Sequence, residues 1–160
     1  MSETMKTKQT ADVLTAVYKN VKMASDSILT LMPKVKDENL KSDMTVQLSA
    51  FDAFASRAAK LLGEEGAKPE EENIVTKLSA KWGSMLNTMR DSTSTHIAEM
   101  LVEGATMGVN DMMRELRDAE NSCVSESALR LVRDVCAFEE RIVEDMRNTY
   151  LRPEYCQKGN

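Results

Sequence analysis

The stretch that decides the fold is residues 63–94, GEEGAKPEEENIVTKLSAKWGSMLNTMRDSTS, which separates two pairs of long helical patterns. Its first part, EEGAKP (residues 64–69), carries the Gly and Pro residues typical of a loop. Its middle part predicts a helix over residues 70–89, because Ile74, Leu78 and Trp82 share one face. A connection of about 30 residues can cross the side of a helix bundle, whereas an up-and-down bundle needs only a short loop here. The stretch therefore predicts two antiparallel helix hairpins joined by a long crossover that carries an additional helix.

The first hairpin is predicted from two apolar stripes, which indicate helices over residues 10–32 and 38–62. Asp37 is expected to cap the second helix, while Pro33 and Gly63 are expected to end the two helices. Apolar residues recur at steps of three and four in both stripes. The first stripe is Val13, Val17, Val21, Ala24, Ile28, Leu31 and Val35, and the second is Leu40, Met44, Leu48, Phe51, Ala55, Ala58 and Leu62.

The second hairpin is predicted as helices over residues 95–117 and 125–150. Ser92 or Ser94 can cap the earlier of these helices, Ser125 can cap the later one, and Pro153 marks its far end. The similar helix lengths and short turns favour antiparallel packing within each pair. We expect one helical domain over residues 10–151, with a flexible N-terminus at residues 1–9 and a C-terminal tail at residues 152–160.

The composition narrows the class of protein. The 160 residues are 29% charged and 42% hydrophobic, as in ordinary globular proteins, and the low aromatic content with 12 Met favours helices. A net charge of -5 and a pI of about 5.1 argue against a nucleic-acid partner. No apolar run approaches the ~20 residues of a membrane span. The polar start and an odd number of cysteines (three) predict a cytoplasmic protein with reduced thiols.

Several motifs resemble a bacterial ferritin-like family of unknown function. They are KVKDENLKSDM (34–44) after the first long helix, KWGSML (81–86) in the crossover helix, and HIAEMLVEGATMGVNDMMRELRD (96–118) before the last long helix. The resemblance extends over roughly residues 13–151 and implies an all-α, ferritin-like four-helix bundle with the additional helix in the crossover.

The wider ferritin-like superfamily holds metal with a Glu on two helices and a Glu-x-x-His motif on the other two. This sequence departs from that pattern, because it contains no Glu-x-x-His. Its first two long helices also place no Glu or His on their inward faces by helical-wheel position. A complete di-iron site is therefore not expected, and we expect no cofactor, with bound iron or manganese as the alternative.

The only histidine of the chain lies in HIAEMLVEG (96–104), where His96, Glu99 and Glu103 stack on one side of the predicted helix. Such a set can ligate a metal ion. On the helical wheel, however, the three residues lie opposite the apolar arc, so a solvated face is the simpler interpretation. Two acids near a helix N-terminus also suit the helix dipole. Metal ligation would need a second protomer.

The apolar arc of the same helix is wider than one bundle seam requires. We predict that the crossover helix covers part of it and that a homodimer contact covers the rest. Gly104 and Gly108 would permit close approach of another helix, and with Met112 they form the predicted oligomer face. A homodimer or another protein partner is therefore expected.

Glu139 is the candidate for a buried polar site. It falls in the middle of the apolar face of the last long helix, where an unpaired charged carboxylate is costly unless it is protonated. Gln47 is the nearest polar counterpart at the edge of the second stripe. One hypothesis makes Glu139 and Gln47 a remnant polar site at the bundle centre. In the other, Glu139 reaches the rim or bonds to a Tyr, a Lys or water.

Three functions stay open at this point. The missing ligands favour a non-enzymatic bundle that serves as an interaction or structural module, with no catalytic residues. A metal-binding oxidoreductase using Glu139 is the alternative, and a carrier with a small-ligand site in the bundle core is the third.

Overall fold

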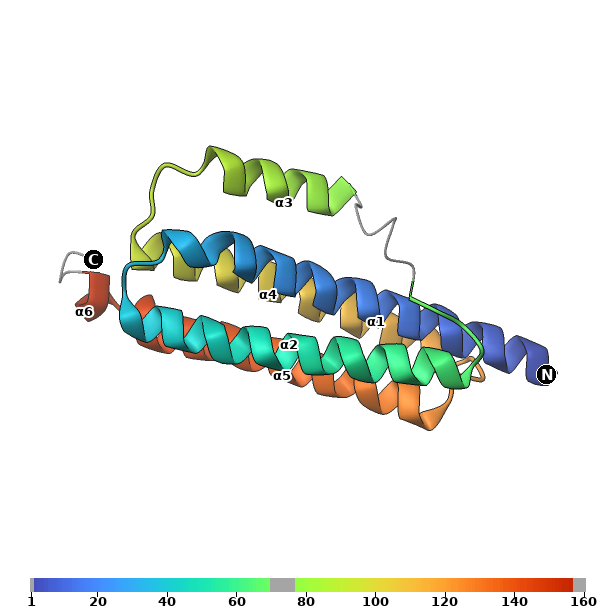
Figure 1. Ribbon diagram of the computed structural model, residues 1–160. Helices are drawn as coiled ribbons and strands as arrows, with labels where there is room; N and C mark the ends of the chain where they lie inside the picture. The colour runs from blue at the N-terminus through green and yellow to red at the C-terminus, as the bar shows by residue number, and fades with distance from the viewer. Residues whose placement is uncertain (1, 70–76, 157–160) are drawn as a thin grey trace.

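Four long helices form the bundle (Figure 1). The computed structural model describes residues 2–69 and 77–156, without the side chains of residues 77–82, 155 and 156. One antiparallel hairpin consists of α1 (Glu3–Leu31) and α2 (Glu38–Glu64), and the other consists of α4 (Ser94–Ala119) and α5 (Glu126–Tyr150). The short helices η1 (Met32–Lys34) and α6 (Pro153–Cys156) follow α1 and α5. The predicted pair of hairpins is confirmed.

The crossover contains α3 (Lys77–Thr88), which lies on the outside of the bundle and packs along α1 (Figure 1). The chain leaves α2 at one end of the bundle and returns along α3 to the other end before α4 begins. As a result α4 runs in the direction of α2, and α5 runs in the direction of α1. The predicted start of the crossover helix at residue 70 lies outside the described residues.

The N-terminal end of α1 differs from the prediction. The helix begins at Glu3, seven positions before the predicted start, so residues 3–9 continue the helix that we expected to start at Thr10. The side chain of Ser2 caps it by accepting a hydrogen bond from the backbone N–H of Met5. The apolar stripe begins only at Val13, so the sequence pattern contained no signal for this exposed first part of the helix.

Two other helix boundaries also differ. Gly63 does not end α2, which continues to Glu64, and the chain turns at Gly66 with a φ of 73° that favours glycine. Thr93, and neither predicted serine, caps α4 by accepting a hydrogen bond from the N–H of His96. The predicted caps Asp37 and Ser125 are confirmed.

Polar contacts tie the two hairpins together at both ends. Near the start of α5, the hydroxyl oxygen of Thr10 accepts a hydrogen bond from the N–H of Ser125 at 3.0 Å. At the other end of α5, the hydroxyl of Tyr150 donates to Asp43 of α2 at 2.6 Å. Between these ends, the rings of Phe51 and Phe138 meet edge to face at 5.2 Å. These contacts fix the register of α5 against α1 and α2.

The wide apolar arc of α4 is buried mainly inside the chain. Met100 and Met112 are buried, Met107 is half-buried, and Met113 stays 53% exposed. The crossover helix does not cover this arc in the way that we predicted, because α3 packs chiefly on α1. Among the described residues, no helix combines the length and the apolarity needed to cross a membrane.

Candidate functional site: a polar centre in the bundle

Glu139 of α5 lies at the centre of the bundle and is only 1% exposed. Its carboxyl group rests on the backbone of α4 at Gly108. A Cβ atom added at position 108 would lie 2.5 Å from the carboxyl carbon of Glu139, closer than two such atoms can approach. Gly108 therefore provides the space in which the carboxyl group sits.

Two amide side chains complete the polar centre. Asn20 of α1 donates its Nδ2–H to the carbonyl oxygen of Gly108 at 3.3 Å, and Gln47 of α2 is also buried. Three buried oxygens in this centre have no hydrogen-bond partner within the described part of the chain: Asn20 Oδ1, Gln47 Oε1 and Glu139 Oε2. All four long helices thus contribute to one polar centre, with α4 supplying the backbone.

The polar centre borders a cavity of about 50 Å³ that Asn20, Gln47 and Glu139 help to line. Most of the other lining residues are apolar or small, and they come largely from α1 and α4. Several of them, including Met23, Gly104 and Met107, are half-buried, so the cavity reaches toward the surface between these two helices. The remaining wall is formed by residues such as Met100, Ala105 and Phe51.

Burial governs the protonation of Glu139. Loss of solvation raises the pKa of this carboxyl group to about 9, and the negative charge of Asp111 on α4 adds to the rise. At neutral pH the group is therefore a neutral acid that can donate one hydrogen bond and accept others. Burial, with the nearby carboxyl groups of Glu140 and Glu139, also raises the pKa of the neighbouring Cys136 thiol.

The structure brings Glu139 and Gln47 to the same cavity, where the sequence placed a possible polar remnant. Glu139 does not reach the rim, and no Tyr or Lys of the described residues bonds to its Oε2 atom. Asn20 was missed. It directly precedes Val21 of the first stripe, and a helical-wheel search for amides, in addition to Glu and His, would have found it.

The predicted oligomer face requires a correction. Gly108 and Met112 are buried inside the chain, where Gly108 contacts Glu139 and Met112 belongs to the core. Gly104 is half-buried and lines the cavity. The close approach that Gly108 permits is therefore made by the carboxyl group of Glu139 within the same chain.

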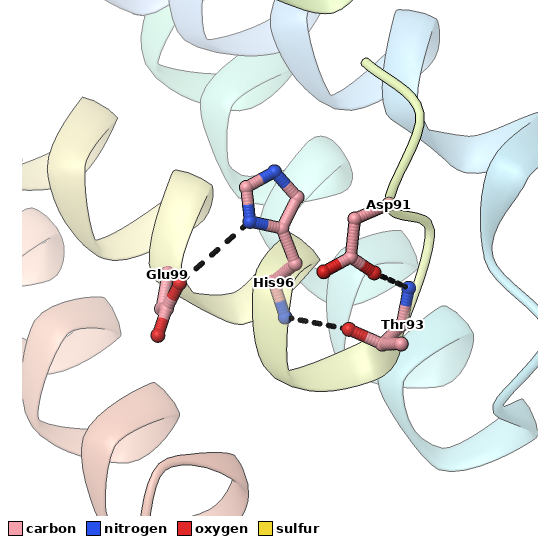
Figure 2. A network of polar contacts seen from close by, with 4 residues as sticks. All are labelled: Asp91, Thr93, His96 and Glu99. Atoms are coloured by element: carbon pink, nitrogen blue, oxygen red, sulfur yellow. Dashed lines mark hydrogen bonds and ion pairs between the residues drawn. The ribbon is translucent and has the colours of Figure 1, made fainter.

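The histidine stretch lies at the N-terminus of α4, as Figure 2 shows. The Nδ1 atom of His96 is 3.7 Å from a carboxylate oxygen of Glu99, and both side chains are at least 36% exposed. Glu103 is exposed as well. The predicted solvated face is confirmed. Among the side chains that the structure describes, no three from His, Cys, Asp or Glu group closely enough to hold a metal ion.

The polar network beside His96 stabilises the helix start (Figure 2). Asp91 accepts a hydrogen bond from the N–H of Thr93 at 2.9 Å, and Thr93 caps the helix. The hydrogen bonds from Thr93 hold the pKa of Asp91 below its usual value. Asp91 and Thr93 therefore serve as a cap for the N-terminus of α4.

Comparison with solved structures identifies the fold. A Dps1 mutant from Mycobacterium smegmatis matches with a TM-score of 0.72 and 14% sequence identity, over 92% of this chain and 98% of that one. No protein-family model matches the chain, and no curated protein matches it by sequence. The chain therefore has the ferritin-like, all-α fold that the sequence predicted. At this level of identity the match concerns the fold alone.

Proposed function

We propose that this chain is a non-enzymatic ferritin-like bundle, an interaction or structural module without a complete di-iron site. One observation supports this most directly: the polar centre contains a single carboxyl group, that of Glu139, beside the amides of Asn20 and Gln47. A ferritin-like di-iron centre draws about six ligands from four helices. Here the residue three positions after Glu139 is Ile142, where that pattern has a His.

The donor set fits iron or manganese poorly. Metal ions of this kind need several carboxylate or imidazole ligands, and they bind the deprotonated carboxylate. Glu139 has a pKa of about 9 and offers one charge at most, while the two amides are neutral. A metal-binding oxidoreductase remains the alternative function, because a buried carboxyl group at the centre of a ferritin-like bundle is the feature it would need.

Metal analysis distinguishes these two functions. We expect protein produced in medium with added iron or manganese, and purified without chelators, to hold well below one metal ion per chain. A content of about two ions per chain, the stoichiometry of a di-iron centre, would contradict the proposal. The Glu139→Ala variant serves as the control, because metal retained by it would be bound elsewhere on the protein.

The interaction proposal includes a homodimer or another protein partner in the cytoplasm. Large apolar side chains are more than half exposed on three helices: Leu29, Val46 and Met113. A contact with another chain would bury the apolar area of these side chains, which a monomer leaves in water. Because Gly108 and Met112 are inside the chain, the contact has to use such outer positions.

We expect static light scattering on the purified protein to give a mass near twice the 17.9 kDa of one chain. Replacing Val46 or Met113 by lysine should shift the mass toward that of one chain if its helix forms the contact. The Met5→Lys variant, which changes an exposed residue in the first turns of α1, is the control. A mass of one chain at all concentrations would contradict the homodimer.

A further inference from the structure

Three buried side-chain oxygens of the polar centre have no hydrogen-bond partner among the described residues: Asn20 Oδ1, Gln47 Oε1 and Glu139 Oε2. They belong to side chains that line one cavity. A buried acceptor without a donor is costly, so three of them in one centre favour a guest that supplies donors. Glu139 can donate only one hydrogen bond, even when it is protonated.

The orientation of one acceptor is fixed by the backbone. The Nδ2–H group of Asn20 is held by the carbonyl oxygen of Gly108 at 3.3 Å, and turning the amide over would place two oxygens against each other. Oδ1 is therefore the atom of Asn20 left for a guest. The guest has to bring N–H or O–H groups, and a positive charge would suit the carboxyl group of Glu139.

The cavity limits the size and the polarity of the guest. Its volume is about 50 Å³. One water molecule needs roughly 10–15 Å³ on the same measure, so about three to five non-hydrogen atoms fit. Apart from the polar atoms, the walls are mainly apolar and include Met23, Met100 and Ala105. A guest with one polar end and one short apolar end matches this division.

We propose that the cavity binds a small primary amine in its ammonium form, with the three N–H groups directed to the oxygens of Asn20, Gln47 and Glu139. An ammonium group carries three donors and no acceptor, which matches three unpaired acceptors. The alkyl chain lies along the apolar walls from α1 and α4. This inference goes beyond the proposed function, which stands whether or not an amine binds.

Proton balance makes the binding dependent on pH. The neutral carboxyl group of Glu139 gives up its proton to solvent when the ammonium ion binds, leaving a carboxylate beside the cation. Asp111 of α4 is the charged neighbour that raises the pKa of Glu139. Helices α1 and α2 contribute the neutral amides of Asn20 and Gln47 to the same cavity. On α5 itself, Cys136 and Glu140 lie near Glu139. Below pH 9 the affinity should therefore rise about tenfold with each pH unit.

The test is a titration of the ¹⁵N-labelled full chain with propylamine, followed by NMR at pH 7 and pH 8. We expect saturable shifts of the backbone amides of Gly104 and Gly108, with a dissociation constant on the order of 1 mM at pH 8 and about tenfold weaker binding at pH 7. Tetramethylammonium has the same charge without N–H donors, and 1-propanol has the chain without the charge. Neither should cause these shifts.

Two variants complete the test. Glu139→Gln should weaken propylamine binding at least tenfold and remove its pH dependence, whereas Glu140→Gln, an exposed neighbour, should bind as the unmodified chain does. Gln47→Leu removes a different acceptor and should also weaken binding, which keeps the test decisive if Glu139→Gln does not fold. An absence of shifts up to about 50 mM amine at pH 8 would overturn the proposal, as would equal shifts with tetramethylammonium. A cavity filled only by water gives the first of these results.

Discussion

Replacing Glu139 by glutamine is expected to remove most of the loss of stability that the raised pKa of Glu139 predicts between about pH 5 and pH 9. The folded chain holds the proton of Glu139 up to a pKa of about 9, whereas in the unfolded chain the group titrates near its ordinary value of 4.5. Between these two values only the folded state keeps the proton. The contribution of Glu139 to the free energy of unfolding is therefore fully present below the lower pKa. It decreases as the pH rises between the two pKa values and is lost above the higher one.

The expected size follows from the distance between the two values. Each pH unit lowers the free energy of unfolding by about 1.4 kcal/mol, so the whole interval is worth at most about 6 kcal/mol. The glutamine side chain has nearly the shape of the protonated acid and does not titrate. The difference in unfolding free energy between the variant and the unmodified protein should therefore shift steadily in favour of the variant as the pH rises.

Urea unfolding followed by circular dichroism at five pH values from 5 to 9 measures this difference. Glu140→Gln is the matched control, because Glu140 is the next residue of α5 and is exposed. Its stability should follow the pH profile of the unmodified protein. Parallel profiles for Glu139→Gln and the unmodified protein would mean that Glu139 is already ionised inside the folded bundle.

The helices and their pairing could be predicted because apolar periodicity is a local signal. The stripes from Val13 to Leu31 and from Leu40 to Leu62 specify one buried face each, and the caps Asp37 and Ser125 are read from single residues. The length of the crossover then excludes a simple up-and-down order of helices. These features depend on residues that are close together in the sequence.

The polar centre could be predicted only in part. Glu139 stood out because a carboxyl group interrupts an apolar face, which local reasoning detects. Asn20 did not stand out, because an amide beside a valine stripe is common at the edge of a helix face. The meeting of Asn20 with Gly108, 88 positions apart in the sequence, depends on how α1 packs against α4. The sequence pattern of either helix alone does not contain this information.

The same reasoning explains the error at Gly108 and Met112, which the prediction placed on an oligomer face. Small residues on a helix indicate that something approaches closely, and the pattern does not identify what approaches. The prediction assigned the partner to another chain, whereas the structure shows the carboxyl group of Glu139 against Gly108. At Gly63 and Gly66, two glycines three positions apart both permit a helix end, and the positive φ selects Gly66.

Replacing Gly108 by alanine is expected to destabilise the protein by about 1–3 kcal/mol, although alanine is the better helix former by about 1 kcal/mol. The new Cβ atom would occupy the position of the Glu139 carboxyl group, which would have to move within a buried centre that already contains unpaired oxygens. Gly63→Ala in α2 is the control, because a Cβ atom there meets nothing within 4 Å. This control should be neutral or slightly stabilising.

A double-mutant cycle between positions 108 and 139 then separates the contact with the carboxyl group from other effects of the substitution. In the Glu139→Ala background the carboxyl group is gone, so the alanine at position 108 fills vacated space and keeps its higher helix propensity. We expect the cost of Gly108→Ala to vanish or reverse there, which gives a coupling free energy of at least about 1 kcal/mol by urea unfolding. Coupling near zero would mean that the carboxyl group moves away without cost. Glu139 would then not require the space that Gly108 leaves. A large coupling would show that the glycine at position 108 and the buried acid at position 139 depend on each other, so that the polar centre contributes to the packing of α4 against α5.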